Sequence, residues 1–221
     1  MRNIVCMRWR TNSSESSKWS ETVRKVGNTI HKLGGMMSEK KASREMKESP
    51  PTRITPGDAL WPRRLTERLG ASEPLQLFVL GNLDLLALPK TTLFCSARCP
   101  GKIILTAYDQ AAKWRDTGRC VISGFHSPVE KECLQILLRG NQPVIICPAR
   151  SLPKRVPPAW RNPLTAGRLL LLSCFRESEH RVTADLAARR NEFVAALADE
   201  VWFAHITPGG QMERLAKKFC R

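Results

Sequence analysis

The fold of this chain is decided by residues 119–147, which read RCVISGFHSPVEKECLQILLRGNQPVIIC. A short apolar run begins at Val121, and Pro128 suits the first turn of a helix because its missing N–H is not needed there. Apolar residues then recur at helical spacing until Gly140, which ends the helix, and a second apolar run follows at 144–146. This pattern predicts strand, helix and strand, the unit of a parallel sheet with a right-handed crossover.

The turn between the first strand and the helix contains Ser123 and Gly124. It lies at the carboxyl end of the strand, where ligands bind in open α/β sheets. Free N–H groups and the helix dipole favour an anion there, phosphate above all. We therefore expect a phosphate-binding turn at this point of the sheet.

The alternation of strands and helices continues on both sides of this stretch. Apolar runs predict further strands at 75–80, 91–96, 168–173 and 200–206. Apolar residues at helical spacing predict helices near 101–117, 183–198 and 211–220. We predict an α/β fold with a doubly wound, mostly parallel, Rossmann-like sheet of about six strands.

Residues 1–53 differ from the rest of the chain. They carry 12 Lys and Arg residues against 5 acids and contain neither Phe nor Tyr. This composition is typical of a disordered basic extension, and a basic arm that touches nucleic acid is the alternative. We expect one folded domain over 54–221, with a lead-in helix and strand over 54–90 and the α/β core over 91–221.

In a chain that alternates strands and helices, the last helix, 211–220, should be followed by another strand, but the sequence contains none after it. Two alternatives follow: either the sheet ends at this helix, or the core is truncated at its C-terminus. Strand 200–206 would then be an unprotected edge, prone to pair with another chain.

The charge of the whole chain points to a polyanionic partner. It carries 36 Lys and Arg residues against 20 acids, a formal charge of +16. Nucleic acid is the first candidate, and a basic surface that only aids solubility is the alternative. No apolar run approaches the roughly 20 residues that span a bilayer, so we expect no membrane partner. The eight cysteines form no C-x-x-C pair, which favours a reducing cytoplasm without disulfides.

Small and basic residues follow the predicted parallel strands at one rim of the sheet, where they suit phosphate contacts. The alternative is that tight turns simply need small residues. The candidates are Ser96, Arg98, Lys102, Ser123, Gly124, Arg150, Lys154, Arg155, Ser173, Arg190, Gly209 and Gly210.

No catalytic constellation can be assembled from the sequence. Ser123 has no obvious His partner, nothing marks Cys95 or Cys99 as activated, and the four histidines lack metal-ligand spacing. Acids on the predicted helices are most often solvated; they are Glu130, Glu132, Asp185, Glu192 and Glu213. We expect a protein that is not an enzyme and uses no cofactor or metal.

Six segments follow one another in the order of a known family. They are GDALWPRRL at 57–65, LFVLG at 77–81, CSAR at 95–98, SGFHSPVE at 123–130, LLSC at 171–174 and RNEFVAALA at 190–198. On these segments the region 54–221 resembles the Rossmann-like core of the DNA-processing protein A (DprA/Smf) family. The resemblance adds Asn191, in the family's R-N-R-I-I-A-G-L-S segment, to the candidate site.

This resemblance implies a specific function. Members bind single-stranded DNA without base specificity, act as homodimers, and help to load a RecA-type recombinase during natural transformation. They are not known as enzymes. The resemblance therefore implies these partners for this chain as well.

A second resemblance gives an alternative. Pro208-Gly209-Gly210 followed by Glu213 is similar to the P-G-G-x-G-T-x-x-E loop of lysine-decarboxylase-like (LOG) proteins. Those proteins are phosphoribohydrolases that act on nucleoside monophosphates, and their sheet is of a related Rossmann type. The alternative function is therefore that of a nucleotide-binding Rossmann protein of this type.

Overall fold

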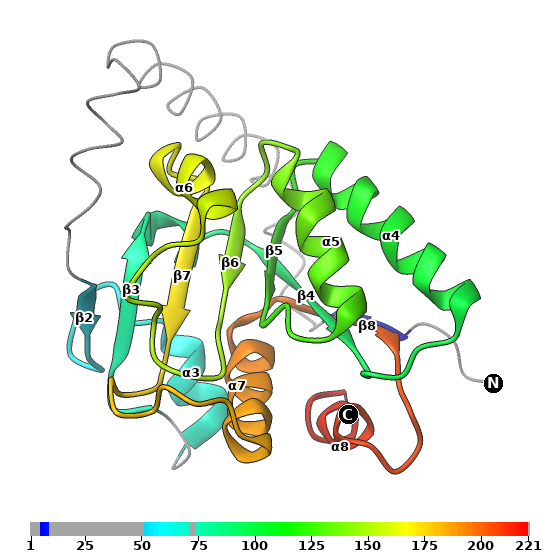
Figure 1. The fold of residues 1–221 in the computed structure, drawn as a ribbon. Helices are drawn as coiled ribbons and strands as arrows, with labels where there is room; N and C mark the ends of the chain where they lie inside the picture. Colours follow the sequence, from blue (N-terminus) through cyan, green and yellow to red (C-terminus); the bar gives the residue numbers. More distant parts are fainter. Residues whose placement is uncertain (1–4, 9–50, 71–73, 221) are drawn as a thin grey trace, which may run out of the picture.

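The computed structural model describes residues 5–8, 51–70 and 74–220. These residues contain one eight-stranded sheet in the order β1-β8-β4-β5-β6-β7-β3-β2 (Figure 1). The strands are β1 (Val5–Arg8), β2 (Thr52–Ile54), β3 (Leu77–Gly81), β4 (Lys90–Cys95), β5 (Cys120–Ser123), β6 (Val144–Ile146), β7 (Leu169–Ser173) and β8 (Glu200–His205). The helices are α3 (Arg63–Leu69), the 3-10 helix η2 (Leu83–Leu86), α4 (Gly101–Asp116), α5 (Pro128–Leu138), α6 (Pro158–Thr165), α7 (Ala184–Leu197) and α8 (Gln211–Phe219).

The predicted fold class is confirmed. The five central strands, β8, β4, β5, β6 and β7, are parallel to their neighbours. The sheet is wider than expected because β1 and β2 add a strand at each end, both in antiparallel pairs. Strand β3, which was predicted at 75–80, pairs with β7 in antiparallel orientation.

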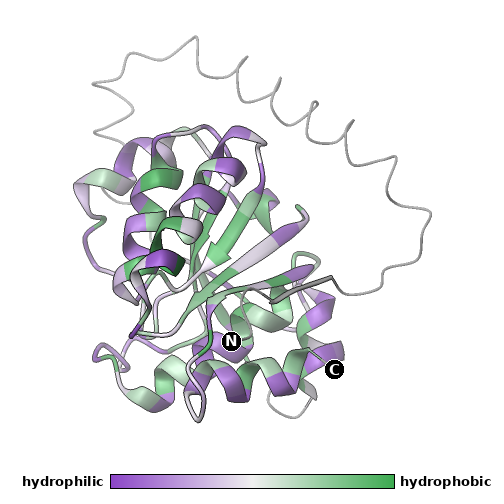
Figure 2. Ribbon diagram, turned by 90° about the vertical axis from the view of Figure 1, so that its right-hand side faces the viewer, coloured by the Kyte–Doolittle hydropathy of each residue, from purple (hydrophilic) through white to green (hydrophobic). Residues whose placement is uncertain are grey.

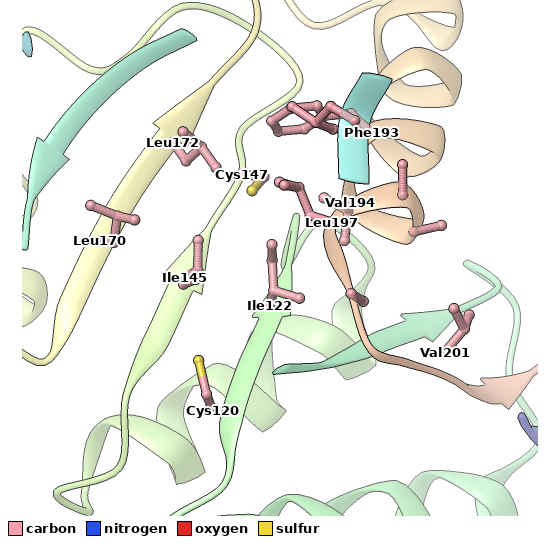
Figure 3. Packing of buried hydrophobic residues seen from close by; sticks show 14 of the residues in the cluster. Cys120, Ile122, Ile145, Cys147, Leu170, Leu172, Phe193, Val194, Leu197 and Val201 are labelled. Carbon is pink, nitrogen blue, oxygen red and sulfur yellow. The ribbon is translucent and has the colours of Figure 1, made fainter. Parts of the chain in front are cut away.

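Helices cover both faces of the sheet, with α4, α5 and α6 on one side and α3, α7 and α8 on the other (Figure 1). Side chains alternate between the two layers, so that Leu93 packs under α4 while its neighbour Phe94 packs on the other side. Figure 3 shows strand residues such as Ile122 and Ile145 facing Phe193 on α7. The strands are therefore apolar on both faces and the helices polar outside (Figure 2), as expected for a parallel sheet.

Helix α5 begins where the sequence predicts. Ser127 is its N-cap and accepts a hydrogen bond from the Glu130 N–H, while the Glu130 carboxylate accepts one from the Ser127 N–H. Pro128 occupies the first helical position. This reciprocal capping box, together with Pro128, fixes the end of the turn after β5.

The lead-in helix α3 is fastened to the sheet by two arginines. Arg64 forms an ion pair with Asp199, and Arg68 donates to the carbonyl oxygens of Ala196 and Ala198, at the end of α7. A guanidinium suits this place because the C-terminus of a helix carries partial negative charge.

The expectation of an unprotected edge at strand 200–206 is wrong. Strand β1 pairs with β8 in antiparallel orientation, with Val5 opposite Phe203 and Arg8 opposite Glu200. The outer backbone N–H and C=O groups of β8 therefore pair with β1 and not with a further C-terminal strand. The rest of the expected extension, residues 1–4 and 9–50, lies outside the described residues, and β2 includes its last two residues, Thr52 and Arg53.

Removing β1 should expose this edge. We expect a variant that lacks residues 1–8 to self-associate, because the outer N–H and C=O groups of β8 would be free to pair with another chain. Light scattering over a concentration series measures this. A shortened protein that stays monomeric at every concentration would show that β1 does not protect β8.

Among the helices that the structure describes, none is both long enough and apolar enough to span a membrane.

Candidate functional site

The loops that follow β4, β5 and β6 lie side by side at one end of the sheet. These strands are neighbours and parallel, so their carboxyl ends meet at the same edge. We call residues 96–102, 124–127 and 147–157 the carboxyl rim. None of its three segments contains an Asp or Glu residue.

The carboxyl rim carries exposed cations that no carboxylate neutralises. Five predicted site residues belong to this group, and within the described part of the chain none of them forms an ion pair; they are Arg98, Lys102, Arg150, Lys154 and Arg155. They come from the loops after β4 and β6, on either side of the β5 turn. The structure thus brings these five residues to one surface.

The opposite end of the sheet is different. Arg64 pairs with Asp199 there, and Arg119 donates to Glu200 at 2.5 Å and to the Thr91 hydroxyl at 2.7 Å. These cations are partly buried and their charge is locally compensated. Arg64 and Arg119 therefore differ from the five rim cations, which have no carboxylate partner among the described residues.

The serines among the predicted site residues support the turns from inside. The Ser123 hydroxyl donates to the Leu93 carbonyl at 2.6 Å and accepts from the Phe125 N–H at 3.2 Å. The Ser173 hydroxyl donates to the Arg150 carbonyl at 2.8 Å. Both serines are buried and lie outside the exposed cluster.

The loop after β8 is joined to the rim through Ser96. The Ser96 hydroxyl accepts from the Thr207 N–H at 3.0 Å. Further along that loop, Gly209 adopts a φ of 72° and its N–H donates to the Glu213 carboxylate at 3.0 Å, and the Gly210 N–H donates to the Thr207 carbonyl. The N–H groups of both predicted glycines therefore already have partners within the chain.

The turn after β5, where the sequence predicts a phosphate, holds a carboxylate of the chain itself. Glu130 is 4% exposed, and its Oε1 accepts from the Cys95 N–H at 2.9 Å. Its Oε2 accepts from the N–H groups of His126 at 2.8 Å and Ser127 at 3.2 Å. Glu130 thereby occupies the donors at the α5 N-terminus that would otherwise meet an external anion.

Arg190 and Asn191 are also buried. The Arg190 guanidinium donates to the Cys147 carbonyl at 3.0 Å and to Asn191 Oδ1 at 2.8 Å. It lies so close to Gly124 that a Cβ atom built on this glycine would come within 1.1 Å of Arg190 Nη1. Gly124 is needed because the guanidinium fills the space of a side chain.

Burial and charge act against each other in this ionic core. Burial raises the pKa of Glu130, while Arg190 and the N–H donors of His126, Cys95 and Ser127 lower it. Burial also lowers the pKa of Arg190, and Glu130 raises it. Each ion thus offsets part of the desolvation cost of the other.

Two features of this end of the sheet were missed as site residues. His126 is exposed between the two groups of rim cations, and burial, Arg190 and Lys131 together lower its pKa, so the ring is neutral at pH 7. Arg176 and Arg181, in the loop after β7, are exposed as well. The sequence could have indicated them, because both follow the predicted strand 168–173, at its carboxyl end.

Four of the groups considered as catalytic candidates are buried or paired with other side chains. Burial raises the pKa of Cys95 and Cys99, and with it the cost of forming a thiolate. Glu213 also lies 3.4 Å from Lys217, and Glu192 lies 2.8 Å from Lys218. No group of His, Cys, Asp or Glu residues that could hold a metal is found over 51–70 and 74–220.

Comparison with known proteins agrees with this geometry. Two solved structures, each 20% identical in sequence, share the fold. The X-ray structure of DNA processing protein A from Streptococcus pneumoniae matches with a TM-score of 0.62 over 82% of this chain and 64% of that one. A structure of DNA processing protein A from Helicobacter pylori, described for its unique single-stranded DNA binding mode, matches with a TM-score of 0.60 over 76% of this chain and 78% of that one.

The chain therefore spans 64% of the length of the S. pneumoniae protein. A comparison with curated protein sequences gave no match. The model of one protein family, DNA recombination-mediator protein A, matches residues 52–206, from β2 to the residue that follows β8. Since this match covers more than half of the sequence, the chain belongs to the DNA recombination-mediator protein A family.

Proposed function

We propose that this protein binds single-stranded DNA, without base specificity, through phosphate contacts on the carboxyl rim. The observation that carries the proposal is the set of five exposed cations, with no acid in the same three segments. Phosphate contacts fix the position of a nucleic acid but read no sequence. A surface built from such contacts suits a strand of any sequence.

The five cations differ in how they would hold the strand. Arg98, Arg150 and Arg155 each present a planar fork that matches two phosphate oxygens. Lys102 and Lys154 supply mobile point charges. The exposed, neutral ring of His126 lies between the two groups, where it can stack on a base whatever its identity.

The family supports a wider role. The H. pylori relative is described as binding single-stranded DNA, and we extend this to the present chain. By the same reasoning we propose DNA processing in natural transformation, with loading of a RecA-type recombinase by a homodimer in the cytoplasm. The phosphoribohydrolase alternative lacks such support, because Glu213 is held by Gly209 and Lys217.

A titration tests the proposal directly. Fluorescence anisotropy with labelled oligonucleotides of different base composition should give nearly equal affinities at one salt concentration. The logarithm of the binding constant should fall linearly with the logarithm of salt concentration, by about 0.7 for each phosphate contact. Absence of binding, or a strong preference for one base sequence, would contradict the proposal.

Two lysines of α4 provide a matched pair of variants. Lys102 lies in the first turn, at the rim, and Lys113 lies near the other end, about 16 Å away along the helix axis. Both are exposed. We expect Lys102→Ala to weaken binding to every oligonucleotide and to lower the salt slope by about 0.7, while Lys113→Ala changes neither. Equal effects of the two variants would mean that only the net charge matters.

A further inference from the structure

A carboxyl group and a guanidinium group are buried beneath the carboxyl rim. Glu130 is 4% exposed and Arg190 is 3% exposed. Ions of this kind are rarely buried unless they are paired and fully hydrogen-bonded. Both lie below the rim, so we asked which parts of the rim they contact.

Each ion joins parts of the chain that are distant in sequence. Glu130 links the end of β4, through the Cys95 N–H, to the turn after β5, through the His126 and Ser127 N–H groups. Arg190 links α7 to the end of β6, through the Cys147 carbonyl. Since Arg190 also lies against Gly124, all three segments of the rim rest on the same two side chains.

Both side chains are already engaged within the chain. The Nε and Nη1 atoms of Arg190 donate to Asn191 and Cys147, and its Nη1 occupies the space beside Gly124. The His126 and Ser127 N–H groups, just before the first turn of α5, are taken by Glu130. A DNA phosphate would have to break these contacts to enter the turn.

We propose that Glu130 and Arg190 are positioning residues, which hold the three rim segments at the spacing that DNA phosphates require without contacting DNA. Glu130 takes the place that a bound phosphate would fill at the α5 N-terminus, and Arg190 fills the space beside Gly124. This inference rests on the proposed function where its effect is measured as DNA affinity. The arrangement leaves the exposed cations Arg98, Arg150 and Arg155 as the groups that meet the strand.

Salt dependence distinguishes a positioning residue from a contact residue. Arg190→Met should weaken binding to a labelled oligo-dT by about tenfold, with a salt slope equal to that of the unchanged protein. Arg98→Ala should also weaken binding but lower the slope by about 0.7. Arg189→Met is the matched control, because this neighbour on α7 is exposed and should keep full affinity. A slope reduced by about 0.7 in Arg190→Met, or an unchanged affinity, would overturn the inference.

The variant Arg190→Lys shows whether the positive charge or the shape of the guanidinium matters. It keeps the positive charge but cannot donate to Cys147 and Asn191 with one rigid fork. We expect Arg190→Lys to bind DNA as weakly as Arg190→Met. Recovery of affinity by lysine would show that the charge alone is needed and would count against positioning.

Hydrogen exchange of the free protein tests the inference without DNA. In Arg190→Met, the amides of 124–127 and 147–150 should exchange faster, while those of β5 and β6 stay protected, which also shows that the variant is folded. Unchanged exchange in both segments would overturn the positioning role. If the unchanged protein fails to bind DNA while these amides respond as expected, the proposed function falls and the structural role of the two ions remains.

Discussion

Replacing Glu130 with glutamine should lower the free energy of unfolding by about 3 kcal/mol. The carboxylate accepts from three buried N–H groups, on Cys95, His126 and Ser127. An amide has one oxygen, so at least one of these donors would face an NH2 group that cannot accept. The variant would also remove the negative charge that raises the pKa of the buried Arg190 guanidinium, so less of the cost of burying that group would be offset.

Urea-induced unfolding measures this effect as a shift of the midpoint at constant slope. Glu132→Gln is the control, since Glu132 lies on the same helix but is exposed, and it should stay within about 0.5 kcal/mol of the unchanged protein. If the two variants were equally stable, the hydrogen bonds of Glu130 would not matter for folding.

The second large effect concerns DNA binding. Simultaneous replacement of Arg150, Lys154 and Arg155 by alanine should reduce the affinity for single-stranded DNA about a hundredfold, because each charged contact contributes about 1 kcal/mol. All three residues are exposed in the loop after β6, so the fold should be unaffected. Anisotropy titration at fixed salt measures the change in affinity, and circular dichroism verifies the fold.

The control removes the same charge elsewhere. Arg63, Lys113 and Arg139 are exposed and lie outside the carboxyl rim. Their triple replacement by alanine lowers the net charge equally and should change the affinity less than threefold. Similar losses for the two triple variants would mean that DNA responds to total charge rather than to the rim.

Much of the parallel core could be predicted because its signals are local. Helix α5 shows this well, since Pro128 and the Ser127–Glu130 capping box mark its start within four residues. The edges of the sheet could not be predicted. Strand β1 has four residues, and its pairing is determined by β8, a partner that lies 192 positions later in the sequence. The orientation of β3 likewise depends on β7, to which it is joined only in space.

The exposed cations of the site could also be predicted, because Arg98 and Arg150 follow apolar strands within four residues. Burial could not be predicted in the same way. Arg190 has the chemistry of a surface residue, and only the packing of α7 against the turn at Gly124 places it inside. For Glu130 a signal was present, since a capping-box glutamate reaches back to the backbone N–H of the N-cap residue.

The position of β1 also matters while the chain is being made. Val5–Arg8 is made well before β8, which begins at Glu200. At about 5–20 residues per second, β1 waits roughly 10–40 s for the strand that it pairs with. Strands β5, β6 and β7 have both of their neighbours before β8 is made, so the centre of the sheet can form while β1 still waits for its partner.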